Sequence, residues 1–128
     1  MAKPIHIVFS LVLLYGCSKN RASNLAGLYE CNFRSFGWHF GDYYDTTYVR
    51  DLRVVAHNGI ISIDGYYGFE VPEKSLNYEN CYQSGSSQKW EKLCFPKNGV
   101  EFSYGHSYHN SSGTTTYIGT RKKINALI

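Results

Sequence analysis

The densest group of residues with chemical potential lies between Trp38 and Asp45, in the segment Trp-His-Phe-Gly-Asp-Tyr-Tyr-Asp. Flat rings beside carboxylates suit saccharide binding, because rings stack on the apolar faces of a sugar while carboxylates accept its hydroxyl protons. We expect the segment to form a loop between two strands, where binding residues often sit on a rigid scaffold. The candidate ligand-binding residues are Trp38, His39, Asp42, Tyr43, Tyr44 and Asp45.

Two other interpretations of this segment compete with ligand binding. Carboxylates about 5–10 Å apart across a cleft can hydrolyse a glycosidic bond, but a small domain has little room for such a cleft. Alternatively, Trp38 and Tyr43 cap the open end of a barrel while Asp42 and Asp45 are solvated. The sequence favours this structural role over binding, and binding over catalysis.

Other chemical motifs are weak or absent. His106 and His109 could share a metal ion, but their surroundings indicate a loop without a third ligand, so we expect exposed histidines and no metal site. The chain contains no G-x-S-x-G, phosphate loop or HExxH, the usual signatures of nucleophilic, nucleotide-binding and zinc enzymes. The sequence therefore predicts no enzyme, no catalytic residues and no cofactor.

The chain has four cysteines, Cys17, Cys31, Cys81 and Cys94. Cys81 and Cys94 lie on two segments that can pair across a turn at 83–88, so we expect a disulfide between them in an exported compartment. Cys31 would then be a buried small apolar residue. A bridge from Cys31 to either of the other two remains open.

The first residues have the order of a secretory signal. Lys3 precedes an apolar run over 5–14, and the small residue Gly16 precedes Cys17. The run is about half the roughly twenty residues that a membrane-spanning helix needs, so we expect it to be removed. Its ending, Leu14-Tyr15-Gly16-Cys17, resembles the lipobox of bacterial lipoproteins. That resemblance implies that a diacylglycerol is attached to the Cys17 thiol.

The same resemblance implies a location in the bacterial cell envelope. Ser18 is compatible with the outer membrane, and residues 18–24 lack the run of acids that accompanies surface display in some lipoproteins. We therefore expect an outer-membrane anchor that faces the periplasm. An ordinary cleaved signal, with Cys17 left as a disulfide partner, is the alternative.

We divide the chain into a signal peptide (1–16), a lipidated cysteine with a polar tether (17–25), an all-β domain (26–123) and a tail (124–128). The length after cleavage suits one small domain with its own core. Thirteen basic and ten acidic side chains give too little scattered charge for a nucleic-acid footprint. We interpret Arg121-Lys122-Lys123 as a solvated strand end and expect a monomer.

Alternation of apolar and polar residues predicts seven or eight short antiparallel strands, which close into a small barrel or sandwich. Tyr29–Phe33 shows the pattern most clearly. Residues 46–64 predict a hairpin, because Asn58-Gly59 supplies the two positive-φ positions of a type I′ turn.

The remaining connections are less regular. We expect further tight turns at Asp64-Gly65 and Asn98-Gly99, and a helical turn or loop at 73–80. Residues 105–113 are rich in glycine, serine, asparagine and histidine, which indicates an exposed loop. A final strand is expected over about 114–122.

Aromatic residues are unusually frequent, with 12 Tyr, 7 Phe and 2 Trp in the chain. Tyrosines at alternating strand positions suit core filling: Tyr29, Tyr48, Tyr67, Tyr104 and Tyr117. Adjacent residues of a strand point to opposite faces, so one ring of Tyr43-Tyr44 and one of Tyr66-Tyr67 should be exposed. Such rings could serve a binding surface.

Several segments resemble a group of small uncharacterised lipoproteins of Bacteroidetes. The similar phrases are Ala26-Gly27-Leu28-Tyr29-Glu30-Cys31, Asp45-Thr46-Thr47-Tyr48 and the stretch Gly113–Lys123. The resemblance implies a lipobox followed by one all-β domain, and it carries no activity. We therefore expect a lipid-anchored, non-enzymatic binding or structural module, with a protein or a glycan as ligand.

Lipid-anchored lysozyme inhibitors provide an alternative. They resemble the chain in size, in the anchor and in an early Tyr-x-Cys, here Tyr29-Glu30-Cys31, while Ser84-Gly85-Ser86 is a partial counterpart of their inhibitory loop. A carbohydrate-binding module is a further alternative.

Overall fold

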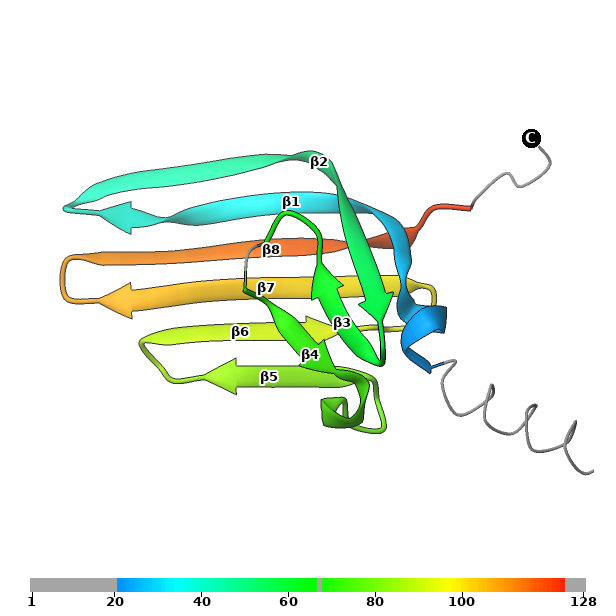
Figure 1. The fold of residues 1–128 in the computed structure, drawn as a ribbon. Helices are drawn as coiled ribbons and strands as arrows, with labels where there is room; N and C mark the ends of the chain where they lie inside the picture. Colours follow the sequence, from blue (N-terminus) through cyan, green and yellow to red (C-terminus); the bar gives the residue numbers. More distant parts are fainter. Residues whose placement is uncertain (1–20, 67, 124–128) are drawn as a thin grey trace, which may run out of the picture.

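The computed structural model describes residues 21–66 and 68–123. It contains one eight-stranded antiparallel sheet that curls into a nearly closed barrel (Figure 1). The prediction of a single all-β domain is confirmed, in its barrel form. The elements are β1 (Gly27–His39), β2 (Asp42–His57), β3 (Ile60–Ile63), β4 (Glu70–Pro72), the 3₁₀ helix η1 (Glu73–Ser75), β5 (Cys81–Gly85), β6 (Lys89–Cys94), β7 (Gly99–Tyr108) and β8 (Ser111–Arg121).

The strand order is β4-β3-β2-β1-β8-β7-β6-β5. All pairs but one join strands that follow each other in the chain, and the exception is the long pairing of β1 with β8. The two free edges of the sheet belong to β4 and β5, which η1 and residues 76–80 connect. The barrel is therefore two meanders joined at their outermost strands.

The core fills the part of the barrel near the chain ends. Tyr29, Cys31 and Phe33 are buried, which confirms the alternation predicted for β1. The ring of Phe102 on β7 lies at the centre, with ring-centroid distances of 4.9 Å to Phe69 and 6.0 Å to Tyr117. The remaining large buried side chains are Leu52, Val54, Ile61, Ile63, Val71, Leu76, Leu93, Phe95 and Val100.

The predicted core tyrosines divide into three groups. Tyr29 and Tyr117 are buried and Tyr104 is half-buried, as expected. Tyr48 is 44 % exposed, although its ring centroid lies 4.6 Å from that of Phe33. Tyr48 is therefore not core filling, because β2 runs along an open part of the sheet. Tyr67 lies outside the described residues.

Three of the predicted turns had different outcomes. Asn58 and Gly59 have φ angles of 52° and 74° between paired His57 and Ile60, which confirms this turn. The tight turn at Asp64-Gly65 is present, closed by a hydrogen bond from Tyr66 N to the Ile63 carbonyl (3.1 Å), but only Gly65 has a positive φ, so the turn is not of type I′. Asn98 takes a positive φ of 56°, but Gly99 already belongs to β7, so this turn is not of the same type.

The predicted loop at 105–113 is wrong. β7 continues to Tyr108 and β8 begins at Ser111, so only residues 109–110 connect them. Small residues here are compatible with strands because rings occupy the space that they leave. Two ring carbons of Trp90 lie 2.7 and 2.9 Å from the position that a Cβ of Gly105 would take, an aromatic cover over a strand glycine.

The predicted tether at 17–25 is too long. Residues 21–25 are helical, and Ala22 is buried in the core. The Arg21 guanidinium donates to the Asn77 carbonyl and to Asn80 Oδ1, both at 2.7 Å. The domain therefore begins at residue 21. The predicted signal peptide, the Cys17 lipid site and the tail at 124–128 lie outside the described residues.

Within those residues, none of the helical segments has the length and apolar character needed to cross a lipid bilayer.

Cys81 and Cys94 are directly opposed on β5 and β6 and form a disulfide, the pairing that the sequence favours. Cys31 is a free, buried thiol on β1. Burial, together with the charges of Asp51 and Glu30, raises the pKa of Cys31 to about 11. The bridge fastens the edge strand β5 to the rest of the sheet.

The disulfide should make a measurable contribution to stability. Replacing both cysteines, as Cys81→Ala/Cys94→Ala, should lower the free energy of unfolding by about 3 kcal/mol, because the loop that the bridge closes is then free in the unfolded chain. Urea denaturation with and without reductant measures this effect. The double variant should not respond to reductant, and a wild type equally indifferent to reductant would contradict the assignment.

Candidate functional site

The segment Trp38–Asp45 is a tight hairpin, so the loop predicted there is wrong. His39 pairs with Asp42, and only Phe40 and Gly41 form the turn, with φ angles of 49° and 89°. Phenylalanine seldom takes a positive φ, so residue types alone do not predict a two-residue turn here.

Strand alternation separates the six predicted ligand-binding residues into two groups. One group lies on the outer face of the sheet and comprises Trp38, Tyr43 and Asp45. The other group lies on the inner face, continuous with the core, and comprises His39, Asp42 and Tyr44. The carboxylates of Asp42 and Asp45 therefore point to opposite faces of β2 and cannot flank one glycosidic bond.

The outer group surrounds a shallow hollow of about 500 Å³ together with Arg34 and Phe36. Arg34 donates two hydrogen bonds to the Asp45 carboxylate, at 3.1 and 3.0 Å, and its guanidinium lies 4.3 Å from the Phe36 ring centroid. The hydrogen bonds from Arg34 lower the pKa of Asp45. Asp45 thus forms an ion pair with its neighbour, while 53 % of its side chain stays accessible to solvent, and its role as a sugar ligand stays a prediction.

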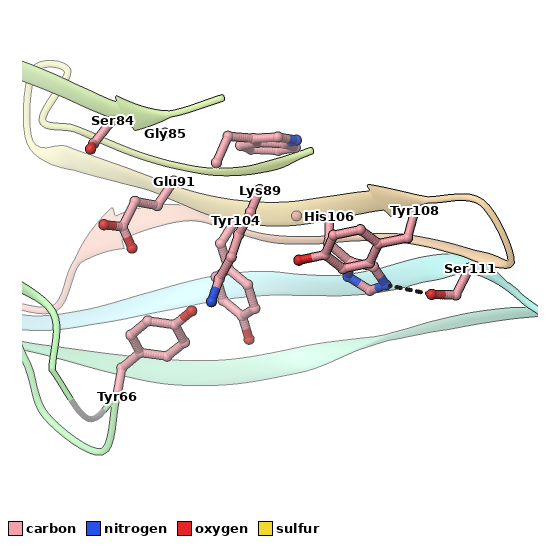
Figure 2. A pocket seen from close by; sticks show the side chains of 11 residues that line it. Tyr66, Ser84, Gly85, Lys89, Glu91, Tyr104, His106, Tyr108 and Ser111 are labelled. Atoms are coloured by element: carbon pink, nitrogen blue, oxygen red, sulfur yellow. Dashed lines mark hydrogen bonds between the residues drawn. The ribbon is translucent and has the colours of Figure 1, made fainter. Parts of the chain in front are cut away.

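A larger groove of about 560 Å³ opens on the inner face, beyond the end of the core (Figure 2). We call it the inner groove. Its side chains come from three neighbouring strands, from the β5 edge and from the connection between β3 and β4. The lining residues are Tyr66, Ser84, Gly85, Lys89, Trp90, Glu91, Tyr104, Gly105, His106, Tyr108 and Ser111.

The register of the sheet places these groups. Tyr104, His106 and Tyr108 alternate along β7 and face the same side. On β6, Glu91 lies opposite Tyr104 and Lys89 lies opposite His106. Trp90, between them, faces away and packs over Gly105. Three β7 side chains and two charges of β6 thus form one continuous wall.

Tyr66 forms the boundary between the core and the inner groove. Its ring centroid lies 5.2 Å from that of Phe102, on the core side, and 4.7 Å from that of Tyr104, on the groove side. Burial, together with the neighbouring Tyr104, Glu91 and Tyr117, raises the pKa of Tyr66 to about 12. Its hydroxyl therefore stays protonated and can donate a hydrogen bond.

His106 is held by its surroundings. Its Nε2 atom lies 3.3 Å from the Ser111 hydroxyl, and its ring lies 5.4 Å from the Tyr108 ring. Gly113 lies beside the His106 ring, and the Tyr44 hydroxyl lies close to the position that a Cβ on Gly113 would take. A larger residue at 113 would displace the Tyr44 hydroxyl, which lies beside His106 of the inner groove.

Lys89 and Glu91 form no ion pair within the described residues. Within residues 21–66 and 68–123, the ion pairs are Arg34–Asp45, Arg53–Asp64 and Lys122–Asp51. In the same part of the chain, no group of three His, Cys, Asp or Glu side chains could hold a metal ion. The inner groove thus offers one cation, one anion, an imidazole and several hydroxyls beside tyrosine rings.

The sequence did not identify the inner groove. His106 and Ser111 were assigned to the loop at 105–113, and the residues of β6 were not considered for binding. Continued alternation of Tyr104, His106 and Tyr108 was a usable signal, because it extends the strand predicted from Val100. Tyr66 could not be found in this way, since it enters from a distant connection.

No protein-family model, curated protein or solved structure matches the chain. The functional argument therefore rests on the geometry of the site and on the residues of the chain.

The half-buried Tyr66, whose pKa is raised, should leave a signature in alkaline unfolding. The unfolded chain releases a tyrosine proton near pH 10, whereas the folded protein holds that of Tyr66 until about pH 12. The stability contributed by Tyr66 is therefore complete below pH 10 and is lost as the pH rises toward 12. Tyr66→Phe should flatten this decline in urea titrations. Tyr78→Phe, at a position 92 % exposed, is the control, and equal profiles for wild type and Tyr66→Phe would contradict the prediction.

Proposed function

We propose that this protein is a non-enzymatic binding module of the bacterial cell envelope, anchored by lipid on Cys17, which binds its ligand in the inner groove. The observation that carries the proposal is the polar, ring-lined face that the barrel leaves uncovered at one end. The volume of the groove lies within the range of small-ligand sites, about 300–1,000 Å³. The lipobox-like ending at Cys17 and the resemblance to small Bacteroidetes lipoproteins support the anchor.

The position of residue 21 determines how such an anchor would orient the barrel. Arg21 is bonded to the barrel, and four peptide units after Cys17 span at most about 15 Å. Residues 21–25 lie at one end of the barrel, and the turns at 40–41, 86–88 and 109–110 lie at the other (Figure 1). The ten residues of β7 separate these ends by about 33 Å. An anchored protein would therefore present the inner groove away from the membrane.

Removal of the thiol tests the anchor. Cys17→Ser should move the protein from the membrane fraction to the soluble fraction of the cell envelope, because two or three acyl chains bind a bilayer durably and none remain. Cys31→Ala, which alters the buried thiol, should stay with the membrane. Mass spectrometry of the wild-type amino-terminal peptide should show the acyl mass. An unmodified amino terminus with a free Cys17 thiol would disprove the anchor.

Inhibition of lysozyme is a second candidate function. Ser84 and Gly85 end β5, and Ser86 begins the turn at 86–88, the hairpin tip that joins β5 to β6, at the end that carries the inner groove. Hydrogen bonds from Ser86 N to the Lys89 carbonyl (2.8 Å) and from Gln88 N to Ser86 Oγ (3.2 Å) hold this tip in shape. A projecting, ordered tip of small polar residues could enter the cleft of a glycosidase. Tyr29-Glu30-Cys31 and the size of the chain add to the resemblance.

A turbidity assay separates this candidate from ligand binding alone. If the tip inhibits lysozyme, excess protein should slow the clearing of a peptidoglycan suspension by a c-type lysozyme. Ser86→Lys should abolish the inhibition by placing a bulky cation at the tip. The matched control is Asn110→Lys, which places the same cation at the neighbouring turn. Full lysozyme activity at excess wild-type protein would exclude the inhibitor and leave binding in the inner groove unaffected.

A further inference from the structure

The inner face changes character along the strands. Beside the core lies a row of apolar side chains that pair across the sheet, including Phe33, Tyr117 and Phe102. Toward the turns, every inner position of the sheet is polar, aromatic or glycine. In strand order from β2 to β5 these positions are Asp42, Tyr44, Thr46, Ser35, Gly37, His39, Ser111, Gly113, Thr115, Tyr104, His106, Tyr108, Lys89, Glu91 and Ser84.

Tyrosine rings provide apolar contact on this face. The Tyr66 and Tyr104 rings lie 4.7 Å apart, centroid to centroid, and form one surface at the inner end of the groove. Tyr108 stands at the outer end beside His106 and is 48 % exposed. Rings of this kind can stack against the C–H face of a pyranose, with each hydroxyl still in reach of a polar atom. The spacing of Tyr104 and Tyr108 along β7 provides for more than one ring contact.

The polar groups supply both donors and acceptors. Lys89 donates and Glu91 accepts, and the hydroxyls of Ser84, Tyr104 and Tyr108 do both. Figure 2 shows the Lys89 side chain extending toward Tyr104 and Tyr66, whereas the Glu91 carboxylate points away from Lys89, so the two charges serve different parts of the groove. Sugar hydroxyls need such mixed partners, because each one donates and accepts.

The composition of the groove disfavours other ligand classes. A phosphate or carboxylate ligand calls for several converging cations, whereas here the one lysine of the lining lies beside a glutamate. A hydrocarbon chain calls for an apolar lining, and the lining contains no aliphatic side chain. A neutral, hydroxyl-rich molecule matches both the rings and the balanced charges.

We infer that the inner groove binds a neutral oligosaccharide, with rings stacked on Tyr104 and Tyr108 and hydroxyls bonded to Lys89 and Glu91. This inference rests on the proposed function, in which the groove is the ligand site. The groove is open to solvent and is not an enclosed cavity, so a saccharide longer than the groove can continue into solvent.

Nuclear magnetic resonance titration of the full-length protein tests the inference. The probes are triacetylchitotriose, maltotriose, cellotriose, mannotriose and xylotriose, each up to about 10 mM, a range that detects dissociation constants of about 1 mM. At least one should shift the backbone resonances of Glu91, Tyr104 and His106. Tyr108→Ala should weaken that binding about tenfold, whereas Tyr108→Phe, which keeps the ring, should bind almost as wild type.

The matched control is Tyr43→Ala, which removes a ring 86 % exposed on the outer face of the same end of the barrel. It should leave the affinity unchanged. No groove shift with any of the five saccharides, or shifts confined to Trp38 and Tyr43, would overturn the inference. A free Cys17 thiol would disprove the anchor alone, and lysozyme inhibition without saccharide binding would overturn the inference while leaving a binding module.

Discussion

The pairing of β1 with β8 is the interaction on which the rest of the barrel depends. It is the one strand pair between distant parts of the chain, and it runs without a break from Tyr29 opposite Arg121 to His39 opposite Ser111. Two glycines, one on each strand, allow the backbones of β1 and β8 to approach each other closely. A Cβ on Gly119 would collide with the Glu30 backbone, and one on Gly37 would collide with the Ser112 backbone. Without this seam the two meanders would have no shared sheet, and the core between them would open.

The length of this seam also explains why a site exists. The rings of the core end at the row of Phe33, Tyr117 and Phe102, but the strands continue together beyond that row. Backbone pairing keeps the extension ordered although no second layer covers its inner face in the described residues. Most polar side chains at those positions remain in contact with water, and the buried hydroxyls of Thr115 and Ser111 are hydrogen-bonded to Ser35 and His106, so little hydrogen bonding is lost on folding. The same sheet thus supports a closed core at one end and an accessible, rigid surface at the other.

Local patterns were sufficient for the strands and insufficient for their arrangement. The alternation around Cys31 and the Asn58-Gly59 turn predicted an all-β barrel or sandwich, because those signals involve residues close in sequence. The seam between β1 and β8 joins residues 72 to 92 positions apart, from His39–Ser111 to Tyr29–Arg121, a separation at which periodicity carries no information. The inner groove could not be predicted from the sequence for a related reason. Composition assigned 105–113 to a loop, yet cross-strand partners such as Trp90 over Gly105 make those residues a strand.

At the end of the barrel with the turns at 40–41, 86–88 and 109–110, the outer and inner faces of the sheet differ in whether their polar groups are free to bind a ligand. On the outer face, Trp38 and Tyr43 offer rings, but the nearest carboxylate, Asp45, is held by both nitrogens of the Arg34 fork. This bidentate contact occupies part of the hydrogen-bonding capacity of Asp45 and offsets its charge. On the inner face, Lys89 and Glu91 have no ion-pair partner among the described residues. Rings alone bind weakly and without orientation, whereas rings beside free polar groups can fix a ligand. The inner groove is therefore the better ligand site, although the outer hairpin face contains the residues that first drew attention in the sequence.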